Sequence, residues 1–234
     1  MVRVLHIGKY YPPFHGGIEN FLRDLAKCQL EQGNVEPSIL VHQHEVGRAD
    51  ETEAVNGVFV RRVRILGKVV FTPIAPLFLK SLNRTIDERN PQILHLHLPN
   101  PSTFWCLFSK KARALPWIIH WHSDVLGSAA TWRVKLLYPL YSIFEHAILR
   151  KVDAIVATSP PYLASSAPLK KYHDKCHVIP LGISANRNSE QRIDDEVSGK
   201  QEADMTTTAA QRSSSESLML VTSIKPRSGQ LRLL

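Results

Sequence analysis

Short apolar runs alternate with amphipathic segments along residues 1–183, and this alternation constrains the fold more than any other feature of the sequence. The runs predicted to be strands are residues 2–7, 38–41, 58–65, 92–98, 117–121, 153–158 and 175–179. The segments predicted to be helical are residues 18–32, 74–89, 101–114 and 129–151. Strands that alternate with helices indicate an α/β fold, here a Rossmann-like, mostly parallel sheet with helices on both faces.

The composition of the chain changes after residue 183. Residues 184–217 are polar and show no periodicity, and only a short apolar run, 218–221, follows them. Such a segment cannot bury enough apolar surface to fold by itself. We therefore expect a Rossmann-like domain over residues 1–183 and a disordered tail, or the remnant of a linker, over 184–234.

Charge and cysteine content narrow the class of protein. The formal net charge of +8 favours anionic partners, such as phosphorylated ligands, nucleic acid or an anionic lipid surface. No nucleic-acid-binding motif is present, so nucleic acid is not an expected partner. Three cysteines without a CxxC pair indicate a reducing, cytoplasmic setting, and we expect neither a signal peptide nor a membrane span.

The segment after the first predicted strand carries two adjacent glycines, Gly16 and Gly17, at the start of a predicted helix. Glycine lets the backbone approach a ligand closely, and the free amides at a helix start favour an anion. A plain turn explains the pair equally well. The segment lacks both the GxGxxG and the GxxxxGK[ST] pattern, which argues against a dehydrogenase or a P-loop kinase.

Polar residues gather where the predicted strands end. Two histidine pairs, His95 with His97 and His120 with His122, each share one face of a strand, and Asp124 follows the second pair. This pattern predicts one of two things. It could be a zinc site of a metal-dependent hydrolase, or a set of core histidines whose outermost members line a cleft at the carboxyl edge of the sheet.

Five segments together resemble the acceptor domain of the family 4 glycosyltransferases, which have the GT-B fold. The segments are YPPFHGGIENFLRDLA (11–26), ILHLHLPN (93–100), IHWHSD (119–124), VDAIVATSP (152–160) and HVIPLGI (177–183). They occur in the family's order and spacing across residues 1–183. The resemblance implies the amino-terminal half of a retaining hexosyltransferase that takes a nucleotide diphosphate sugar as co-substrate and needs no metal or other cofactor.

The resemblance also implies roles for individual residues. Gly16 and Gly17 would lie against the diphosphate of the donor or against the neighbouring acceptor. His122 would be the catalytic residue that hydrogen-bonds and orients the donor sugar.

The acceptor-side cleft would be lined by His97, Asn100, Asp124 and Ser159. The acceptor implied by the family is a glycan or a polyprenyl-linked glycan. Transfer to such an acceptor would place the protein in surface polysaccharide assembly.

The donor half of this family carries two glutamates spaced E-x7-E. Glu45 and Glu53 have this spacing, but they lie in the wrong half, and we interpret them as part of a solvated charged loop. No such pair follows residue 183, so we expect the donor domain to be missing and the chain to be inactive or impaired as a transferase. A non-catalytic sugar- or phosphate-binding module is the remaining alternative.

Two further segments combine positive charge with apolar residues. Residues 58–65 alternate valine and isoleucine with arginine, which predicts a half-exposed strand after an Asn56-Gly57 turn. Residues 131–144 mix cations with aromatic rings. Such a helix can rest on anionic lipid, although a packed helix with snorkelling cations fits as well. We therefore expect a peripheral contact with the inner face of a membrane.

Overall fold

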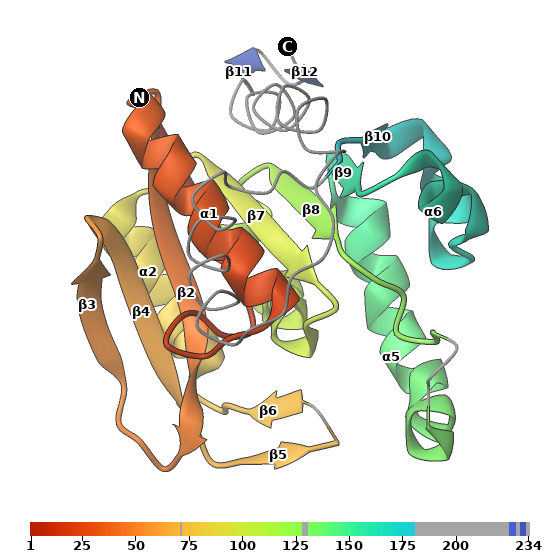
Figure 1. The fold of residues 1–234 in the computed structure, drawn as a ribbon, viewed down its shortest axis with the longest axis horizontal. Coiled ribbons are helices and arrows are strands. Elements are labelled where there is room, and N and C mark those ends of the chain that lie inside the picture. The colour runs from red at the N-terminus through yellow and green to blue at the C-terminus, as the bar shows by residue number, and fades with distance from the viewer. Residues whose placement is uncertain (71, 128–130, 181–224, 228–229, 233–234) are drawn as a thin grey trace, which may run out of the picture. The chain divides into compact units, whose positions relative to one another are not determined.

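The computed structural model describes residues 1–70, 72–127, 131–180, 225–227 and 230–232 (Figure 1). The chain divides into two compact units, Met1–Val178 and Ile179–Leu234. In the second unit, β11 (Lys225–Arg227) and β12 (Gln230–Arg232) form an antiparallel pair. The apolar run 218–221 lies outside the described residues, as does most of the polar segment before it.

An eight-stranded sheet forms the centre of the first unit, with the strand order β10-β9-β8-β7-β1-β2-β4-β3 (Figure 1). Every neighbouring pair is parallel except β3 and β4. The strands are β1 (Val2–Ile7), β2 (Val35–Val46), β3 (Glu51–Val55), β4 (Val58–Ile65), β7 (Ile93–Leu98), β8 (Trp117–Trp121), β9 (Ala154–Ala157) and β10 (Cys176–Val178). The predicted Rossmann-like, mostly parallel sheet is confirmed.

Helices surround the sheet. They are α1 (Gly17–Gln32), α2 (Phe78–Arg89), η1 (Pro101–Phe104), α3 (Trp105–Phe108), α4 (Lys110–Arg113), α5 (Trp132–Lys151), α6 (Pro160–Ser165) and η2 (Pro168–Lys175). In Figure 1, α1 lies in front of the sheet and α2 behind it. Helix α1 ends at Gly33, whose φ of 71° is easily adopted only by glycine, and this confirms the predicted helix end.

Two predicted helices differ from the structure. Residues 74–77 are not helical, because β5 (Gly67–Val69) and β6 (Thr72–Ile74) form a hairpin and α2 begins only afterwards. The predicted helix 101–114 is broken at Ser109, which has an extended backbone. The Ser109 hydroxyl accepts a hydrogen bond from the Ala112 amide, so that serine starts a new helix instead of continuing the old one.

Strand β4 is buried on both faces, so the prediction of a half-exposed strand is wrong. Arg61 points to the α2 side and pairs with Glu88 at 2.5 Å. Arg62 points to the opposite side and pairs with Glu53 at 2.6 Å. Each guanidinium is satisfied by polar groups of another element, and this allows a charged side chain to be buried within a sheet.

The two faces of the central strands carry different side chains. On the α2 side the strands contribute an apolar core that includes Leu5, Ile7, Leu94, Leu96, Leu98, Trp117 and Ile119. On the α1 side the same strands contribute the buried histidines His6, His95, His97 and His120. Side chains alternate along a strand, and this alternation separates the two sets.

Candidate functional site

The chain order reverses at β1, which pairs with β2 on one edge and with β7 on the other. In open α/β sheets, ligands bind beyond the carboxyl ends of the strands at such a switch point. Here the loops that follow β1, β7 and β8 meet at this edge. The amide of His122, just after β8, donates to the carbonyl of Leu98 on β7 at 3.0 Å.

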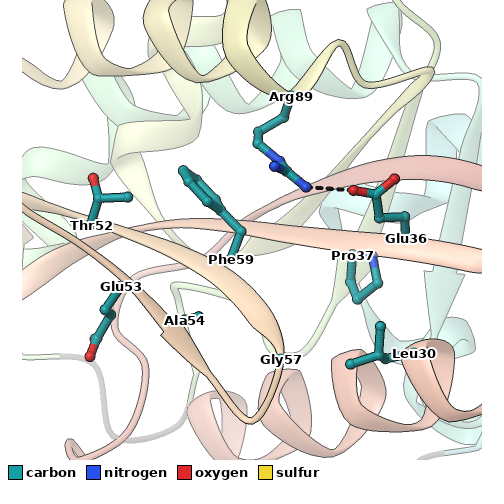
Figure 2. Close-up of a pocket in the computed structure, with 9 residues that line it drawn as sticks. All are labelled: Leu30, Glu36, Pro37, Thr52, Glu53, Ala54, Gly57, Phe59 and Arg89. Atoms are coloured by element: carbon teal, nitrogen blue, oxygen red, sulfur yellow. Dashed lines mark hydrogen bonds and ion pairs between the residues drawn. The ribbon is translucent and has the colours of Figure 1, made fainter.

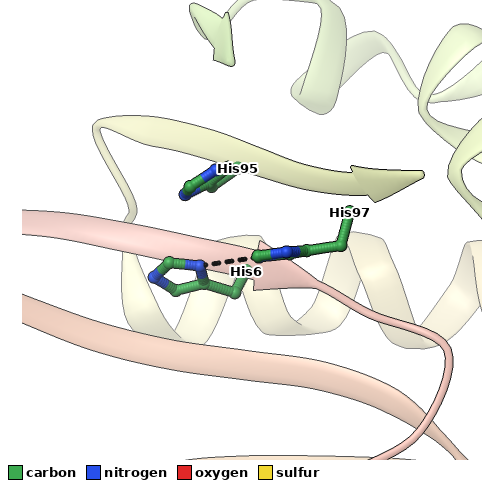
Figure 3. Close-up of side chains that lie close together, drawn as sticks. All are labelled: His6, His95 and His97. Carbon is green, nitrogen blue, oxygen red and sulfur yellow. Dashed lines mark hydrogen bonds between the residues drawn. The ribbon is translucent and has the colours of Figure 1, made fainter. Parts of the chain in front are cut away.

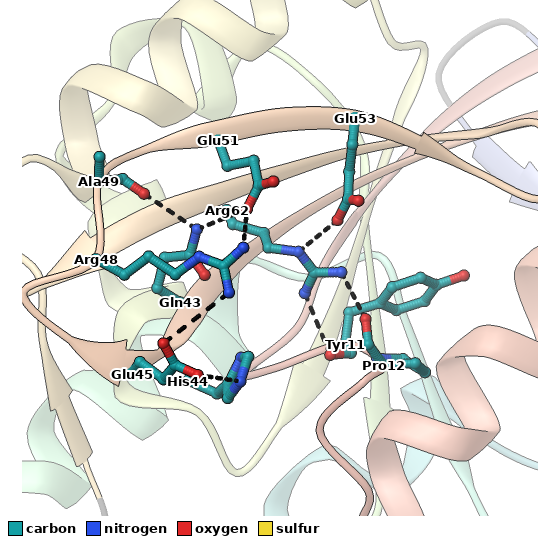
Figure 4. Close-up of polar contacts among 10 residues, drawn as sticks. All are labelled: Tyr11, Pro12, Gln43, His44, Glu45, Arg48, Ala49, Glu51, Glu53 and Arg62. Carbon is teal, nitrogen blue, oxygen red and sulfur yellow. Dashed lines mark hydrogen bonds and ion pairs between the residues drawn. The ribbon is translucent and has the colours of Figure 1, made fainter.

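The loop between β1 and α1 is held in place by a buried arginine (Figure 4). Arg62, only 3% exposed, donates to the carbonyl oxygens of Tyr11 at 3.2 Å and Pro12 at 2.5 Å. Its remaining nitrogen, Nε, donates to Glu53 on β3. The chain segment that leads to the paired glycines is therefore fixed by side chains from the neighbouring strands.

The predicted solvated loop around Glu45 and Glu53 is wrong in its secondary structure. Glu45 lies in β2 and Glu53 in β3, which is hydrogen-bonded along its length to β4. Neither glutamate is on a helix. Glu53 instead supports the β1–α1 loop through Arg62, a role that depends on pairing between strands.

The two glycines differ in their surroundings. A Cβ atom on Gly16 would lie 2.2 Å from Oε2 of Glu19, because the Glu19 carboxylate folds back over the start of α1. A Cβ atom on Gly17 would meet no atom within 4 Å. The first turn of α1 thus presents open backbone at Gly17 and a carboxylate beside Gly16, and an anion that binds there must displace or avoid Glu19.

A layer of histidine rings lies beneath α1. The layer consists of His6 on β1, His95 and His97 on β7, His120 on β8, and His122, and the centroids of neighbouring rings lie between 4.5 and 5.9 Å apart. Phe21 of α1 covers the layer, with its ring centroid 4.5 Å from that of His120 and 5.3 Å from that of His122. The layer therefore extends from the core to the carboxyl edge, where His122 is half-buried.

Burial keeps these rings neutral. It lowers the pKa of His6 to about 4 and that of His122 to about 3. Burial, together with the neighbouring rings, also holds the pKa values of His95, His97 and His120 well below the usual range. At neutral pH each ring therefore has one N–H donor and one bare acceptor nitrogen.

The histidines do not form the metal set that the sequence pattern suggested. His6, His95 and His97 bring one nitrogen each within 4.8 Å of one another (Figure 3). Asp124 is not part of this group. Its Oδ1 accepts hydrogen bonds from Trp121 Nε1 and from the hydroxyls of Tyr162 and Ser166, all between 2.7 and 2.8 Å.

The structure places the predicted site residues in three regions: around the start of α1, beside α6, and at the start of η1. Gly16, Gly17, His97 and His122 lie around the first half of α1.

Asp124 and Ser159 instead contact α6. The Ser159 hydroxyl accepts from the Tyr162 amide and caps that helix, while Asp124 accepts from the Tyr162 hydroxyl. Asn100 is fully buried and caps η1 through the amide of Ser102. Asn100 and Ser159 are thus helix caps of the loops that border the carboxyl edge.

Sequence reasoning missed three polar residues of this region. His6 completes the histidine layer, and Gln29 of α1 hydrogen-bonds to it at 2.9 Å. His42 joins the loop after β1 to η1, through the carbonyl of Lys9 at 2.7 Å and the hydroxyl of Ser102 at 2.8 Å. For the two histidines the available signal was a polar residue in or directly after an apolar run, since such a residue must find a buried partner.

A shallow pocket of about 410 Å³ lies elsewhere, at the amino end of β2 and beside the β3–β4 hairpin (Figure 2). Phe59 and Arg89 form its wall, and Arg89 is paired with Glu36. None of the predicted site residues lines this pocket. The candidate site at the carboxyl edge is therefore separate from this pocket, which lies at the other end of the sheet.

Comparison with known proteins identifies the family. Residues 16–182 match the model of the glycosyl transferase 4-like domain. The chain belongs to this family. This glycosyl transferase 4-like chain is 32% identical over 197 residues to O-antigen chain mannosyltransferase C of Escherichia coli. The match covers 82% of the chain and 49% of the relative.

Solved structures agree with this glycosyl transferase 4-like assignment at the level of the fold. Sucrose-phosphate synthase of Thermosynechococcus elongatus superposes with a TM-score of 0.58 at 16% identity, over 83% of the chain and 53% of that structure. HepE of Anabaena in complex with UDP-glucose gives 0.51 at 14% identity, over 86% and 51%. The glycosyl transferase 4-like domain spans about half the length of these relatives.

Among the described residues, no helix is long and apolar enough to cross a lipid bilayer.

Proposed function

We propose that this chain is the acceptor-side half of a retaining hexosyltransferase that transfers a hexose from a nucleotide diphosphate sugar to a glycan or lipid-linked acceptor. The observation that carries the proposal is the meeting of the glycine-started helix α1 and His122 at the switch-point edge. The family supports the reaction class, and its resemblance supports retention of the anomeric configuration and transfer without a metal. The E. coli relative is named as a mannosyltransferase of O-antigen chains, which supports a glycan acceptor.

The two parts of the edge suit two parts of the donor. Backbone amides at the start of α1 offer hydrogen bonds and a positive dipole end to the diphosphate, which gains charge as it leaves. His122, neutral and half-buried, suits a hydroxyl of the sugar. Asn100, Asp124 and Ser159 lie in or cap the loops on the acceptor side, and His97 lies near the end of β7 beside His122.

We further propose that the 234-residue chain alone has little or no transferase activity. Transfer in a GT-B fold takes place between two domains, and the chain spans about half the length of its relatives. A half-site can still bind the donor weakly through the groups that it provides. The expected behaviour is therefore binding without turnover.

Binding and turnover are tested on the purified chain with a panel of nucleotide sugars that includes UDP-glucose and a nucleoside diphosphate mannose. We expect saturable binding of at least one sugar nucleotide and no transfer above background. Gly17→Ala should weaken binding about tenfold without unfolding the chain, because the added methyl group enters open space beside the amides.

Gly67→Ala is the matched control, since its Cβ atom also meets no neighbour and lies in the β5–β6 hairpin. Robust turnover by the chain alone would contradict the half-enzyme proposal. Failure to bind any member of the panel would contradict a nucleotide-sugar site.

A second proposal concerns the exposed beginning of α5, which we infer rests on anionic lipid. Trp132, Leu136, Leu140 and Ile143 recur at helical spacing, and all are at least 61% exposed. Exposed Phe108 of α3 adjoins this stripe through its contact with Phe144.

Cationic side chains lie near this stripe and favour lipids with anionic headgroups. Arg133 and Lys135 of α5 are exposed. Lys110 and Arg113 of α4 are exposed as well, while Lys111 between them is paired with Asp87. Each cation near an anionic surface contributes about 1 kcal/mol, in addition to the burial of apolar side chains. An acceptor carried on a membrane lipid would be reached from such a position.

Vesicle co-sedimentation tests this attachment. We expect binding to vesicles that contain anionic lipid at low salt, weaker binding at high salt, and loss of binding in the double variant Trp132→Ser with Leu136→Ser. Leu66→Ser is the control, because that leucine is 59% exposed but lies on another part of the molecule. Equal binding by the double variant and the control would overturn the proposed surface.

A further inference from the structure

A continuous chain of hydrogen bonds runs from the core to the candidate site. Oε1 of Gln29 lies 2.9 Å from Nε2 of His6, and Nδ1 of His6 lies 3.2 Å from Nε2 of His97 (Figure 3). Nδ1 of His97 lies 3.2 Å from Nε2 of His122. The chain thus passes from helix α1 through strands β1 and β7 to the residue after β8.

The direction of each hydrogen bond follows from that of the bond before it. The Gln29 carbonyl oxygen can only accept, so Nε2 of His6 carries the proton and Nδ1 of His6 is bare. Nε2 of His97 must then donate, which leaves Nδ1 of His97 bare. By the same rule Nε2 of His122 donates inward, and Nδ1 of His122 is bare.

This rule applies because the rings are neutral. Burial lowers the pKa of His6 to about 4, of His122 to about 3, and of His97 well below the usual range. A protonated ring would donate from both nitrogens and would interrupt the order. Among the described residues, none hydrogen-bonds to Nδ1 of His122, and this atom is not among the buried polar atoms that lack a partner.

We propose that Gln29, acting through His6 and His97, fixes His122 in the tautomer with a proton on Nε2, so that Nδ1 only accepts a hydrogen bond. Gln29, His6 and His97 are positioning residues in this scheme, and His122 alone touches the ligand. The chemistry of that ligand rests on the proposed function: Nδ1 selects a hydroxyl of the sugar. It rejects a phosphate oxygen, which has no proton to donate at neutral pH.

The consequence is a division of the donor between two places. The diphosphate is bound by groups that donate, at the start of α1, and the sugar hydroxyl by the group that accepts, at His122. A reversed chain, with the Gln29 amide nitrogen turned to His6, would present an N–H at His122 and would attract phosphate instead. The proton position on one ring therefore distinguishes two ways of binding the same donor.

The tautomers can be read directly in the unliganded chain by long-range ¹H–¹⁵N correlation spectra at pH 7.5. We expect Nε2–H signals for His6, His97 and His122, with at least about a tenfold excess of this tautomer at His122, which corresponds to about 1.4 kcal/mol. The His122→Asn spectrum assigns the signal. An Nδ1–H tautomer or a charged ring at His122 overturns the proposal.

Substitution of the first residue in the chain tests its role. Gln29→Met keeps the size of the side chain but removes the carbonyl acceptor, so the tautomer excess at His122 should fall severalfold. Gln32→Met on the same helix is the control, because Gln32 is exposed and lies outside the hydrogen-bond chain. An unchanged excess in Gln29→Met would show that Gln29 does not set the tautomer, and would overturn the proposal.

Two additions separate this inference from its alternatives. Zinc is added to the unliganded chain, and stoichiometric binding at His6, His95 and His97 would overturn the hydrogen-bond chain, because the metal would use the same nitrogens. The sugar nucleotide of the panel that binds the chain is added next at a saturating concentration, and a shift of the His122 Nδ1 resonance supports the assignment of the ligand. The expected tautomers without any such shift would contradict the proposed ligand, while the positioning role of Gln29 would stand on the spectra of the unliganded chain.

Discussion

The two faces of strands β1, β7 and β8 are built from neighbouring residues but are stabilised in different ways. On the α2 side, Leu96 and its neighbours are buried among other apolar side chains. On the α1 side, His97 is equally buried but is held by hydrogen bonds from ring to ring. Apolar burial has no preferred direction, whereas each of these hydrogen bonds fixes the orientation of the next.

The difference teaches how one sheet can be both a stable core and a precise site. The apolar face supplies stability at any pH at which the chain is folded. The histidine face loses stability as the pH falls, because its rings are buried in the neutral form. It also extends a defined order of hydrogen-bond donors and acceptors to the carboxyl edge. The predictions below compare the two faces, beginning with the largest effect.

Lowering the pH should reduce the free energy of unfolding through the histidine face. Each buried histidine has a folded pKa below its unfolded value of about 6.5, so unfolding takes up protons below that pH. Their stabilising contribution is complete above pH 6.5 and is lost as the pH falls towards 4, the value to which burial lowers the pKa of His6. His6 alone accounts for about 3 kcal/mol of this loss. Denaturant titrations at several pH values measure it, and a free energy of unfolding that is flat between pH 7 and 5 would contradict it.

The apolar face should respond to lost volume and not to pH. Leu96→Ala should lower the free energy of unfolding by about 2–5 kcal/mol, because Leu96 is fully buried and its removal leaves a cavity. The loss should be the same at pH 7 and pH 6. Leu66→Ala, at an exposed leucine, should change stability by less than about 0.5 kcal/mol.

The paired arginines of β4 extend the comparison to the next strand. Arg62→Met should cost about 1–3 kcal/mol, because it leaves the carbonyl oxygens of Tyr11 and Pro12 without their donor. Hydrogen exchange in residues 9–17 should become faster in this variant. Arg61→Met is the matched control. It loses its contacts with Thr85 and Glu88 on the α2 side and should leave exchange in the loop unchanged.

A buried acid next to the apolar core should give a pH dependence of opposite sign. Burial raises the pKa of Glu145 on α5 to about 7, so its neutral form is favoured in the fold and stability is lost as the pH rises from about 4.5 to 7. Glu145→Gln should therefore stabilise the chain at pH 8 by up to about 3 kcal/mol and have much less effect at pH 5. Thermal unfolding at both pH values gives the comparison, and a loss of stability at pH 8 would refute it.

Local patterns were sufficient to predict the frame of the molecule. The apolar runs gave β1, β7 and β8, and Gly33 gave the end of α1. Strand β3 was not predicted, because its alternating glutamates resemble a solvated loop until their pairing with β4 is known. The arginines of β4 were expected to be partly exposed for the same reason, since their partners lie on other elements.

The site was predictable only in part. The alternation of side chains placed the histidines of β7 and β8 on one face each, and the family resemblance selected His122. It could not show that His6 joins them, because β1 and β7 are far apart in sequence and their pairing is non-local. Nor could the sequence show that Asp124 accepts a hydrogen bond from Tyr162, because Tyr162 belongs to the later helix α6.

The position of β1 in the sheet has a consequence for synthesis on the ribosome. Strand β1 is made before the other strands of this sheet, and it can pair with β2 as soon as β2 has emerged, yet its other edge stays open until β7 arrives. During this interval the unpaired edge of β1 is exposed to other chains. A nascent chain that pauses before residue 93 therefore has a half-built sheet, and this is the stage at which a chaperone would be needed most.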